Sequence, residues 1–267
     1  MRFSGGIAVL VSACSLIPAQ APSKRNPVAA RNAAPDPKAA DPKPDPKPKA
    51  PTERLTYDVE WRLIHAGTVV VETRPAHADL KLDSAGMVSS LFKVQDTYSA
   101  DYEDGFCATA SLMDSIEGKR HHEARSAFDR TRNQASYVER DVIKDTIIHS
   151  NQTEVPNCVH EVVGAILKLR GMAIDPGQSA QIPMSDGRRS SPVKIEAQER
   201  EDVKTPVGSY KTVRYEAYML NGVIYTRKGR VQLWLTDDAR HLPVQFRLRM
   251  NFPIGTVTLQ LEKEEHP

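Results

Sequence analysis

The sequence predicts a mainly β fold: an antiparallel, barrel-like or strongly curved sheet with one amphipathic helix at about residues 156–170. Most segments after residue 53 alternate apolar and polar residues, which is the period of a strand with one buried face. Turn residues recur about every eight to twelve positions, which is typical of barrels and curved sheets. One stretch has helical periodicity instead, and it predicts the helix.

Alternating segments follow one another through residues 53–267. The first runs from Leu55 to Leu63, and we expect His65-Ala66-Gly67 to turn the chain into a second run, Thr68 to Thr73. Asn221-Gly222 lies between two runs and predicts a type I′ hairpin. The other alternating runs are Leu80–Leu82, Val193–Ala197, Val213–Met219, Val231–Leu235, Val244–Met250 and Val257–Leu261.

The helical stretch carries apolar residues at i, i+3, i+4, i+7 and i+8, beginning at Val159. Asn157 is expected to cap its start, with Glu161 in the first turn near the positive end of the helix dipole. Gly171 suits the position after its last turn. We therefore expect one amphipathic helix that lies on the sheet.

Residues 1–21 have the pattern of a signal peptide. Arg2 gives a positive start, an apolar run extends from Ile7 to about Ile17, and Ala19-Gln20-Ala21 matches a signal-peptidase site. The preceding Val11-Ser12-Ala13-Cys14 resembles a bacterial lipobox, in which Cys14 would be lipidated and become the N-terminus. We favour cleavage after Ala21, and lipidation of Cys14 stays open as the alternative.

Residues 22–52 form a linker rich in Pro, Lys and Ala that we expect to be disordered. It contains nine prolines and no aromatic residue, so it cannot bury enough apolar surface to offset the entropy of ordering. It is either a spacer or a basic tether to anionic lipid or cell-wall polymer. The net charge of +2 divides into +1 in the leader, +4 in the linker and −3 in residues 53–267, which argues against a nucleic-acid-binding domain.

Few residues in the folded part suggest chemistry. Cys107 and Cys158 are an even pair in an oxidising compartment, so we expect a disulfide, with two unpaired thiols as the alternative. The sequence contains no G-x-S-x-G, G-x-G-x-x-G or P-loop motif. His121, Glu123 and His160 lack the spacing of metal ligands. We expect no catalytic residue, no metal and no cofactor.

Aromatic residues give the strongest indication of binding. Tyr57, Trp61 and Tyr215 could line the interior of a barrel that holds an apolar ligand, or could simply fill its core. Trp234 has the opposite parity to its neighbours Leu233 and Leu235. It is therefore expected on the other face, where an exposed tryptophan could contact glycan, lipid or protein.

Several segments together resemble the DUF3108 family of exported bacterial proteins, whose biochemical role is not established. They are LTYDVEWRLIHAGTVVVE, CVHEVVGAILKLRGM, VKTPVGSYKTVRYEA, QLWLTDDARHLPVQF and GTVTLQLE. The resemblance covers nearly all of residues 53–267 and implies an envelope protein with one β-rich, barrel-like domain. The family offers no catalytic residues to carry over.

These observations predict an exported protein of the periplasm or cell envelope of a bacterium. We expect it to contact the membrane only through the leader or a lipid anchor. The leading hypothesis is a non-enzymatic domain that binds an apolar or amphipathic ligand, such as a lipid, or a partner, such as an envelope protein or cell-wall polymer. One alternative is a structural or interaction module with a solid core. Another is a hydrolase of cell-wall or polysaccharide material, which requires two carboxyl groups at glycosidase spacing.

Overall fold

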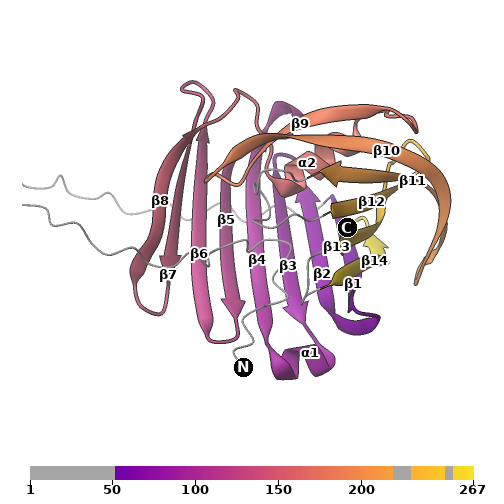
Figure 1. The fold of residues 1–267 in the computed structure, drawn as a ribbon, viewed down its shortest axis with the longest axis horizontal. Helices are drawn as coiled ribbons and strands as arrows, with labels where there is room; N and C mark the ends of the chain where they lie inside the picture. The colour runs from indigo at the N-terminus through magenta and orange to yellow at the C-terminus, as the bar shows by residue number, and fades with distance from the viewer. Residues whose placement is uncertain (1–51, 219–229, 250–254) are drawn as a thin grey trace, which may run out of the picture. The chain divides into compact units, whose positions relative to one another are not determined.

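The computed structural model describes residues 52–218, 230–249 and 255–267 (Figure 1). The leader, Cys14, nearly all of the linker and the expected Asn221-Gly222 hairpin lie outside the described residues. In order, the elements are β1 (Glu53–Trp61), β2 (Ile64–Arg74), β3 (His77–Ser84), α1 (Gly86–Leu91), β4 (Val94–Glu103), a 3-10 turn η1 (Asp104–Phe106), β5 (Cys107–Glu117), β6 (Arg120–Asp129), β7 (Gln134–Asp141), β8 (Thr146–Glu154), α2 (Val162–Arg170), β9 (Ser179–Ser185), β10 (Ser190–Thr205), β11 (Gly208–Tyr218), β12 (Arg230–Thr236), β13 (Pro243–Arg249) and β14 (Thr256–Glu265).

All the strands of the described residues belong to one antiparallel sheet, which confirms the predicted fold class. Its strand order is β8-β7-β6-β5-β4-β3-β2-β1-β14-β13-β12-β11-β10-β9, so consecutive strands pair, except β8 with β9, and β1 pairs with β14. The sheet is not closed, because its edge strands β8 and β9 do not pair with each other. Figure 1 shows β9 and β10 crossing in front of the upper parts of β4 to β6.

Residues 155–161, which we call the strap, join the two ends of this curved sheet. The amide of Ala108, at the start of β5, donates a hydrogen bond to the carbonyl oxygen of Val159 (2.8 Å). On its other side the strap runs parallel to β9, where the His160 amide donates to the Pro183 carbonyl and the Ser185 amide donates to the His160 carbonyl (both 2.9 Å). The strap thus covers the edge of β9 that an open sheet would leave unpaired.

The turn between β9 and β10 makes a second closing contact. Ser126 Oγ on β6 donates to the Asp186 carbonyl (3.0 Å), and Asn151 Nδ2 on β8 donates to the Arg188 carbonyl (3.1 Å). Gly187 has a φ of +85°, and a Cβ there would lie 2.3 Å from Ser126 Oγ. Only glycine therefore allows the turn to approach β6 this closely.

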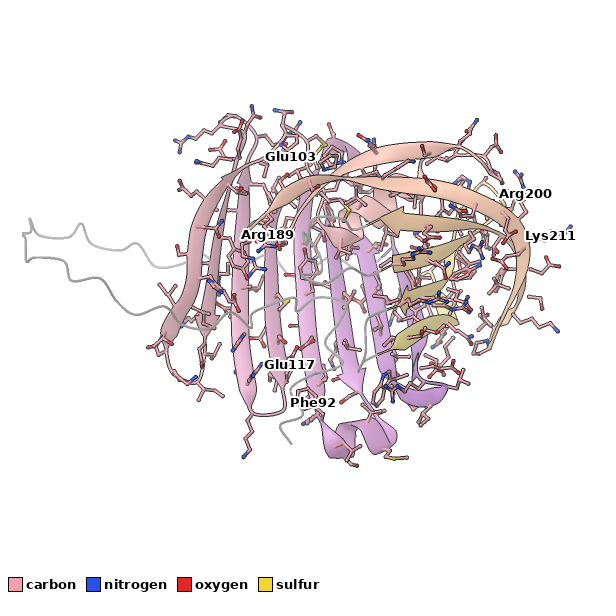
Figure 2. All side chains as sticks on the ribbon, in the orientation of Figure 1. Phe92, Glu103, Glu117, Arg189, Arg200 and Lys211 are labelled. Carbon is pink, nitrogen blue, oxygen red and sulfur yellow. A yellow bond between two sulfur atoms is a disulfide. The ribbon has the colours of Figure 1, made fainter. Side chains whose placement is uncertain are left out.

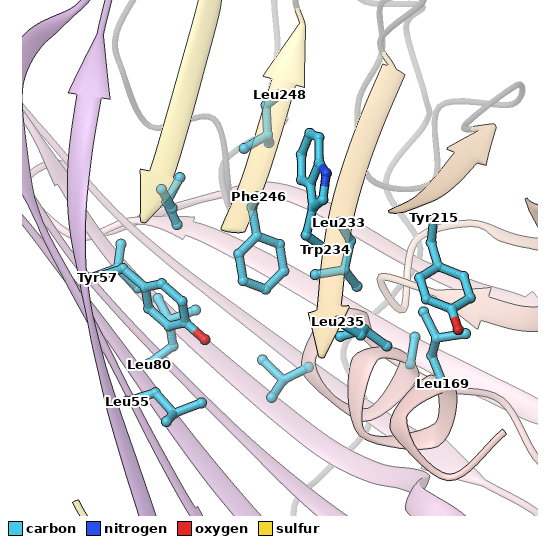
Figure 3. Packing of buried hydrophobic residues seen from close by; sticks show 14 of the residues in the cluster. Leu55, Tyr57, Leu80, Leu169, Tyr215, Leu233, Trp234, Leu235, Phe246 and Leu248 are labelled. Carbon is cyan, nitrogen blue, oxygen red and sulfur yellow. The ribbon is translucent and has the colours of Figure 1, made fainter. Parts of the chain in front are cut away.

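Helix α2 lies inside the curve and completes the core. Its side chains Val163, Ala165 and Leu169 belong to the same apolar cluster as residues from β1 to β4 and β9 to β14. Figure 3 shows Leu169 and Tyr215 pointing into this cluster together with side chains of β12 and β13. At the end of α2, Arg170 donates two hydrogen bonds to the carboxylate of Glu53 (2.6 and 2.9 Å), which joins the helix to the start of β1.

The helix is shorter than its periodicity predicts. It begins at Val162 instead of residue 156, and Asn157 does not cap it. The side chain of Asn157 instead accepts a hydrogen bond from Arg130 Nη2 (3.1 Å) and donates one to the Arg130 carbonyl (3.0 Å). These tertiary contacts hold the strap extended. Gly171 follows the helix with a right-handed φ of −85°, so its position does not require glycine.

The first turn also differs from expectation. Residues 65–67 lie inside β2, and the chain reverses at Arg62 and Leu63, which have φ values of +51° and +66°. Two left-handed residues in a two-residue hairpin are the geometry of a type I′ turn, which usually takes Asn or Gly. Gly67 is small for a different reason: a Cβ there would lie 2.3 Å from the carbonyl oxygen of Asp83 on β3.

The predicted disulfide between Cys107 and Cys158 is present and ties the strap to β5. It closes a loop with a sequence separation of 51 residues, so it restricts the unfolded chain substantially. We predict that the double variant Cys107→Ala, Cys158→Ala loses about 2–4 kcal/mol of unfolding free energy, measured by urea denaturation. Wild-type protein under reducing conditions should behave like the variant. Coincident oxidised wild-type and variant curves would contradict a closing role for the bridge.

Candidate functional site

Two of the four aromatic residues singled out in the sequence are core residues. Tyr57 is fully buried, packs edge-on against Phe246 with ring centroids 5.5 Å apart, and donates its hydroxyl to the Pro243 carbonyl (2.9 Å). Tyr215 is also buried and donates to the Ile174 carbonyl (3.3 Å). Because both hydroxyls are bonded to backbone, these side chains are held as parts of the packing.

The two tryptophans lie elsewhere. Trp61 is half-buried at the end of β1, beneath the guanidinium of Arg62, which lies 5.1 Å from its ring centroid. Trp234 belongs to the main buried apolar cluster, so the expectation that it is exposed is wrong. It is only 2% exposed, since Arg247 covers its ring (5.1 Å to the centroid) and its Nε1 donates to Glu201 (2.8 Å). The four aromatic residues do not converge on one site.

The part of the interior next to α2 is almost filled. A cavity between α2 and strands β1 to β3 has a volume of about 60 Å³ and is lined mainly by apolar side chains. Pockets that hold drug-sized ligands have volumes of roughly 300–1,000 Å³. This cavity is therefore too small for a lipid, and the α2 side of the interior is a solid core.

Residues that pair directly across neighbouring strands form a row along the interior face of the sheet, and this row changes from apolar to polar side chains. From β1 to β3 the row consists of Tyr57, Val69 and Leu82, which are all buried and apolar or aromatic. From β4 to β7 the same row continues through polar residues, in the order Asp96, Ser115, His122 and Asp141. Glu139 lies two residues from Asp141 on the same face of β7. We call Asp96, Ser115, His122, Glu139 and Asp141 the polar patch.

Hydrogen bonds connect the patch only in part. Ser115 Oγ donates to Asp96 Oδ1 (2.6 Å), and His122 Nδ1 lies 3.4 Å from Glu139 Oε1. Lys144 donates to Asp141 Oδ2 (2.7 Å), and its hydrogen bonds lower the pKa of that carboxyl. Asp96 is only 1% exposed, yet its Oδ2 atom has no hydrogen-bond partner among the described residues. Such an oxygen is costly unless a proton, water or ligand satisfies it.

Burial raises the pKa of Asp96 from its ordinary 3.8 to about 6, although the Ser115 hydrogen bond acts in the opposite direction. Asp96 and Asp141 are separated by three strand spacings, about 14 Å, which exceeds the spacing of a glycosidase carboxyl pair. Within the described ranges, no group of three or more His, Cys, Asp or Glu could hold a metal ion. The patch can thus donate and accept hydrogen bonds and attract positive charge.

A second buried carboxylate, Glu161, has a structural position. It is the N-cap of α2 and accepts hydrogen bonds from the amides of Val163 (2.8 Å) and Gly164 and from the hydroxyls of Tyr98 (2.9 Å) and Tyr102 (2.6 Å) on β4. Burial raises its pKa even though these donors lower it. Gly164 makes the approach possible, because a Cβ there would lie 2.8 Å from the Tyr102 ring.

The two histidines that were considered as metal ligands, His121 and His160, lie apart in the structure. His121 points to the outer face, with Nε2 3.0 Å from Asp114 Oδ1, as its strand parity predicts. His160 lies in the strap, where its Nδ1 is 2.7 Å from the Phe106 carbonyl and burial lowers its pKa. The polar patch was not predicted from the sequence, although Asp96 has the same strand parity as the core residues Val94 and Tyr98.

A polar hollow of about 740 Å³ lies on the outer face beside the β6–β7 turn. Its most buried cation, Arg130, already binds Glu103 and both the backbone and side-chain oxygens of Asn157. The hollow therefore belongs to the contacts that fix the strap. It is a weaker candidate for a ligand site than the interior patch.

The buried Glu161 yields a first prediction for this region. Glu161→Gln places an amide N–H₂ against groups that are themselves donors, so we expect a loss of about 2–4 kcal/mol of unfolding free energy at pH 7. Tyr102→Phe removes one donor and should cost about 1–2 kcal/mol. Urea denaturation measures both, with the exposed Glu154→Gln as the control. A Glu161→Gln protein as stable as the control would show that the carboxylate does not anchor α2.

Asp96 yields a prediction of pH dependence. Its folded pKa is raised, so between about pH 4 and pH 6 the folded protein holds a proton that the unfolded chain has released, and stability falls as the pH rises. Asp96→Asn removes this loss. We expect the variant to be about 1–3 kcal/mol more stable than wild type at pH 7 and nearly equal to it at pH 4. Asp104→Asn, at an exposed position that does not contribute to the Asp96 shift, should keep the wild-type pH profile. Equal effects of Asp96→Asn at both pH values would refute the raised pKa.

Comparison with known proteins confirms the resemblance found in the sequence. Residues 56–262 match the family described as "Protein of unknown function (DUF3108)". The chain is similar in fold to a β-barrel-like DUF1849 protein of Brucella abortus, with a TM-score of 0.54 and 9% identity over 82% of this chain and 99% of that one.

A weaker similarity connects the chain to a DUF1089 family protein of Pseudomonas aeruginosa, with a TM-score of 0.38 and 11% identity over 69% of this chain and 90% of that one. No curated protein matches the sequence significantly. The described residues include no helix that is long and apolar enough to cross a membrane.

Proposed function

The chain belongs to the DUF3108 family of proteins of unknown function, and on that premise we propose that it is an exported, non-catalytic envelope protein whose barrel-like domain binds an amphipathic ligand. The polar group of the ligand contacts the polar patch on β4 to β7. Its apolar part lies against apolar side chains of the same strands, such as Met113 and Tyr137, because the space along β1 to β3 is filled.

The observation that carries this proposal is the row that changes from Tyr57, Val69 and Leu82 to Asp96, Ser115 and His122 on one continuous interior face. A sheet face that only fills a core gains nothing from buried carboxyl groups, because each must be desolvated. A ligand with a polar group would satisfy these carboxyl groups at the point where the packed apolar half of the row ends.

The patch also indicates the chemistry of the polar group. It holds the three carboxyl groups of Asp96, Glu139 and Asp141, and Asp96 Oδ2 can accept or, when protonated, donate a hydrogen bond. A cationic or hydroxyl-bearing head group fits this arrangement better than an anion does. The small cavity beside α2 directs the ligand to the β4–β7 side.

Export is supported by the signal-peptide pattern of residues 1–21, with either cleavage after Ala21 or lipidation of Cys14. The Cys107–Cys158 bridge is consistent with an oxidising compartment. The linker of residues 22–52 would then hold the domain away from the membrane or cell wall.

Only one observation, the dense packing around α2, favours the alternative of an interaction module with a solid core. A hydrolase would need two convergent carboxyl groups. Asp96 and Asp141 are too far apart for that role, and Asp141, which lies two residues from Glu139 on β7, is already bound by Lys144. We therefore retain ligand binding as the main proposal and the solid module as the outcome to be excluded.

Native mass spectrometry of protein purified from its own envelope tests the proposal. Wild-type protein should carry a bound small molecule that is released unchanged on unfolding. Asp96→Leu makes the polar end of the row apolar, so we expect at least about tenfold lower ligand occupancy, since a charged hydrogen-bonding partner contributes about 1.5–3 kcal/mol.

Asp114→Leu is the matched control, because it makes the same substitution on the outer face of the neighbouring strand and should keep wild-type occupancy. A wild-type mass equal to that of the processed polypeptide alone would favour the solid module. A ligand recovered in chemically altered form would contradict a non-catalytic role.

A further inference from the structure

Three neighbouring connections of the sheet lie on one edge. In an antiparallel meander the β1–β2 turn, the β3–β4 connection with α1, and the β5–β6 turn must all fall on the same side. Figure 1 shows them along the lower edge of the sheet, and Figure 2 labels Phe92 and Glu117 there and Glu103 at the opposite edge. Backbone hydrogen bonds join them: the Ala85 amide donates to the Ala66 carbonyl (2.8 Å) and the Gly118 amide to the Lys93 carbonyl (2.7 Å).

Large apolar side chains are exposed on these connections. Leu63 in the β1–β2 turn is 91% exposed, and Met87 and Leu91 of α1 are 62% and 77% exposed. At the opposite edge the β6–β7 turn consists of polar residues 130–133, and Phe106 is less exposed (38%) because it packs edge-on against Tyr102. Apolar residues gathered on one edge mark a surface for interaction with an apolar partner.

The turn that presents Leu63 is conformationally unfavourable. Arg62 and Leu63 both have positive φ values, although neither is Gly, Asn or Asp. Asn or Gly would fit a type I′ turn with less strain. Strain of this kind persists where a position is used for function.

Basic residues surround the exposed apolar ones. Arg62, Lys93 and Lys119 are exposed at this edge. Among the described residues, neither Lys93 nor Lys119 has a carboxylate within ion-pair distance, whereas the nearby Asp83 binds Lys81 (2.8 Å). Arg62, Lys93 and Lys119 thus place positive charge at this edge, beside Glu117, although residues 53–267 carry a net charge of −3.

We propose that this edge, made of Arg62, Leu63, Met87, Leu91, Lys93 and Lys119 and called here the tip surface, docks on a bilayer that contains anionic phospholipid. Leu63, Met87 and Leu91 enter the head-group region, and the three basic residues contact lipid phosphates. The combination of apolar tips with positive charge selects a membrane over an uncharged apolar partner. The inference rests on the proposed envelope location and does not require a ligand inside the sheet.

Binding to vesicles tests the tip surface. The exported chain is prepared as Cys14→Ser, so that no acyl chain contributes, and is mixed with vesicles of equal parts phosphatidylglycerol and phosphatidylethanolamine or of phosphatidylcholine alone. We expect at least about tenfold stronger co-sedimentation with the anionic vesicles, reduced by salt. Trp61, next to the β1–β2 turn, should shift its fluorescence to shorter wavelength, while the buried Trp234 gives a constant background.

Two variants separate docking from folding. Leu63→Asn removes an apolar tip and relieves the turn, so vesicle binding should fall about fivefold or more while Tm rises. Lys119→Glu should weaken binding to anionic vesicles and leave binding to phosphatidylcholine unchanged. Val207→Asn is the matched control: it changes an exposed apolar residue in the β10–β11 turn and should keep wild-type binding.

The proposal is overturned if wild-type protein binds both kinds of vesicle equally, or if Leu63→Asn binds as wild type does. It is also overturned if light scattering finds a dimer that Leu63→Asn dissociates, because the tip surface would then be a contact between two copies of the chain. Loss of vesicle binding leaves the bound ligand in the mass spectrum unaffected, so the two proposals fail independently.

Discussion

The rest of the structure depends on the hydrogen bonds that the buried carboxylate of Glu161 accepts. Two amides of α2 and two tyrosine hydroxyls of β4 converge on it, so one side chain both starts the helix and attaches it to the sheet. The attached helix fills one side of the interior. The strap that leads into the helix can then span from β5 to β9. The sheet does not close through strand pairing. The helix and the strap nevertheless close the core on the α2 side, while the interior face of β4 to β7 remains polar.

Much of the fold follows from local patterns in the sequence. In segments such as Leu55–Leu63, apolar and polar residues alternate. This pattern depends only on the local sequence, and it predicts strands well. The start of α2 could not be predicted in this way, because Asn157 is a good helix cap in isolation but binds Arg130, which is 27 residues away. Similarly, nothing local indicates that Arg62 and Leu63, instead of residues 65–67, form the turn.

The candidate site was harder to predict than the fold. The disulfide could be predicted because only two cysteines remain after the leader, which leaves one possible pairing. The polar patch depends on register across four strands, and a register cannot be read from any one of them. The aromatic residues were predicted to contact a ligand, yet the hydroxyls of Tyr57 and Tyr215 donate hydrogen bonds to backbone carbonyls. Trp234 was expected to be exposed because of its parity, yet it belongs to the buried cluster and Arg247 covers its ring.

The pairing of β1 with β14 has a consequence for how the chain folds. The first strand of the domain remains without one of its two partners until residues 256–265 have been made, so this part of the sheet forms late. Contacts of such high sequence separation make folding slow, because a long loop must close before they are gained. A chain that cannot finish its sheet during synthesis stays extended for longer. The export proposed for this protein would use that state, because a secretion channel admits an unfolded chain.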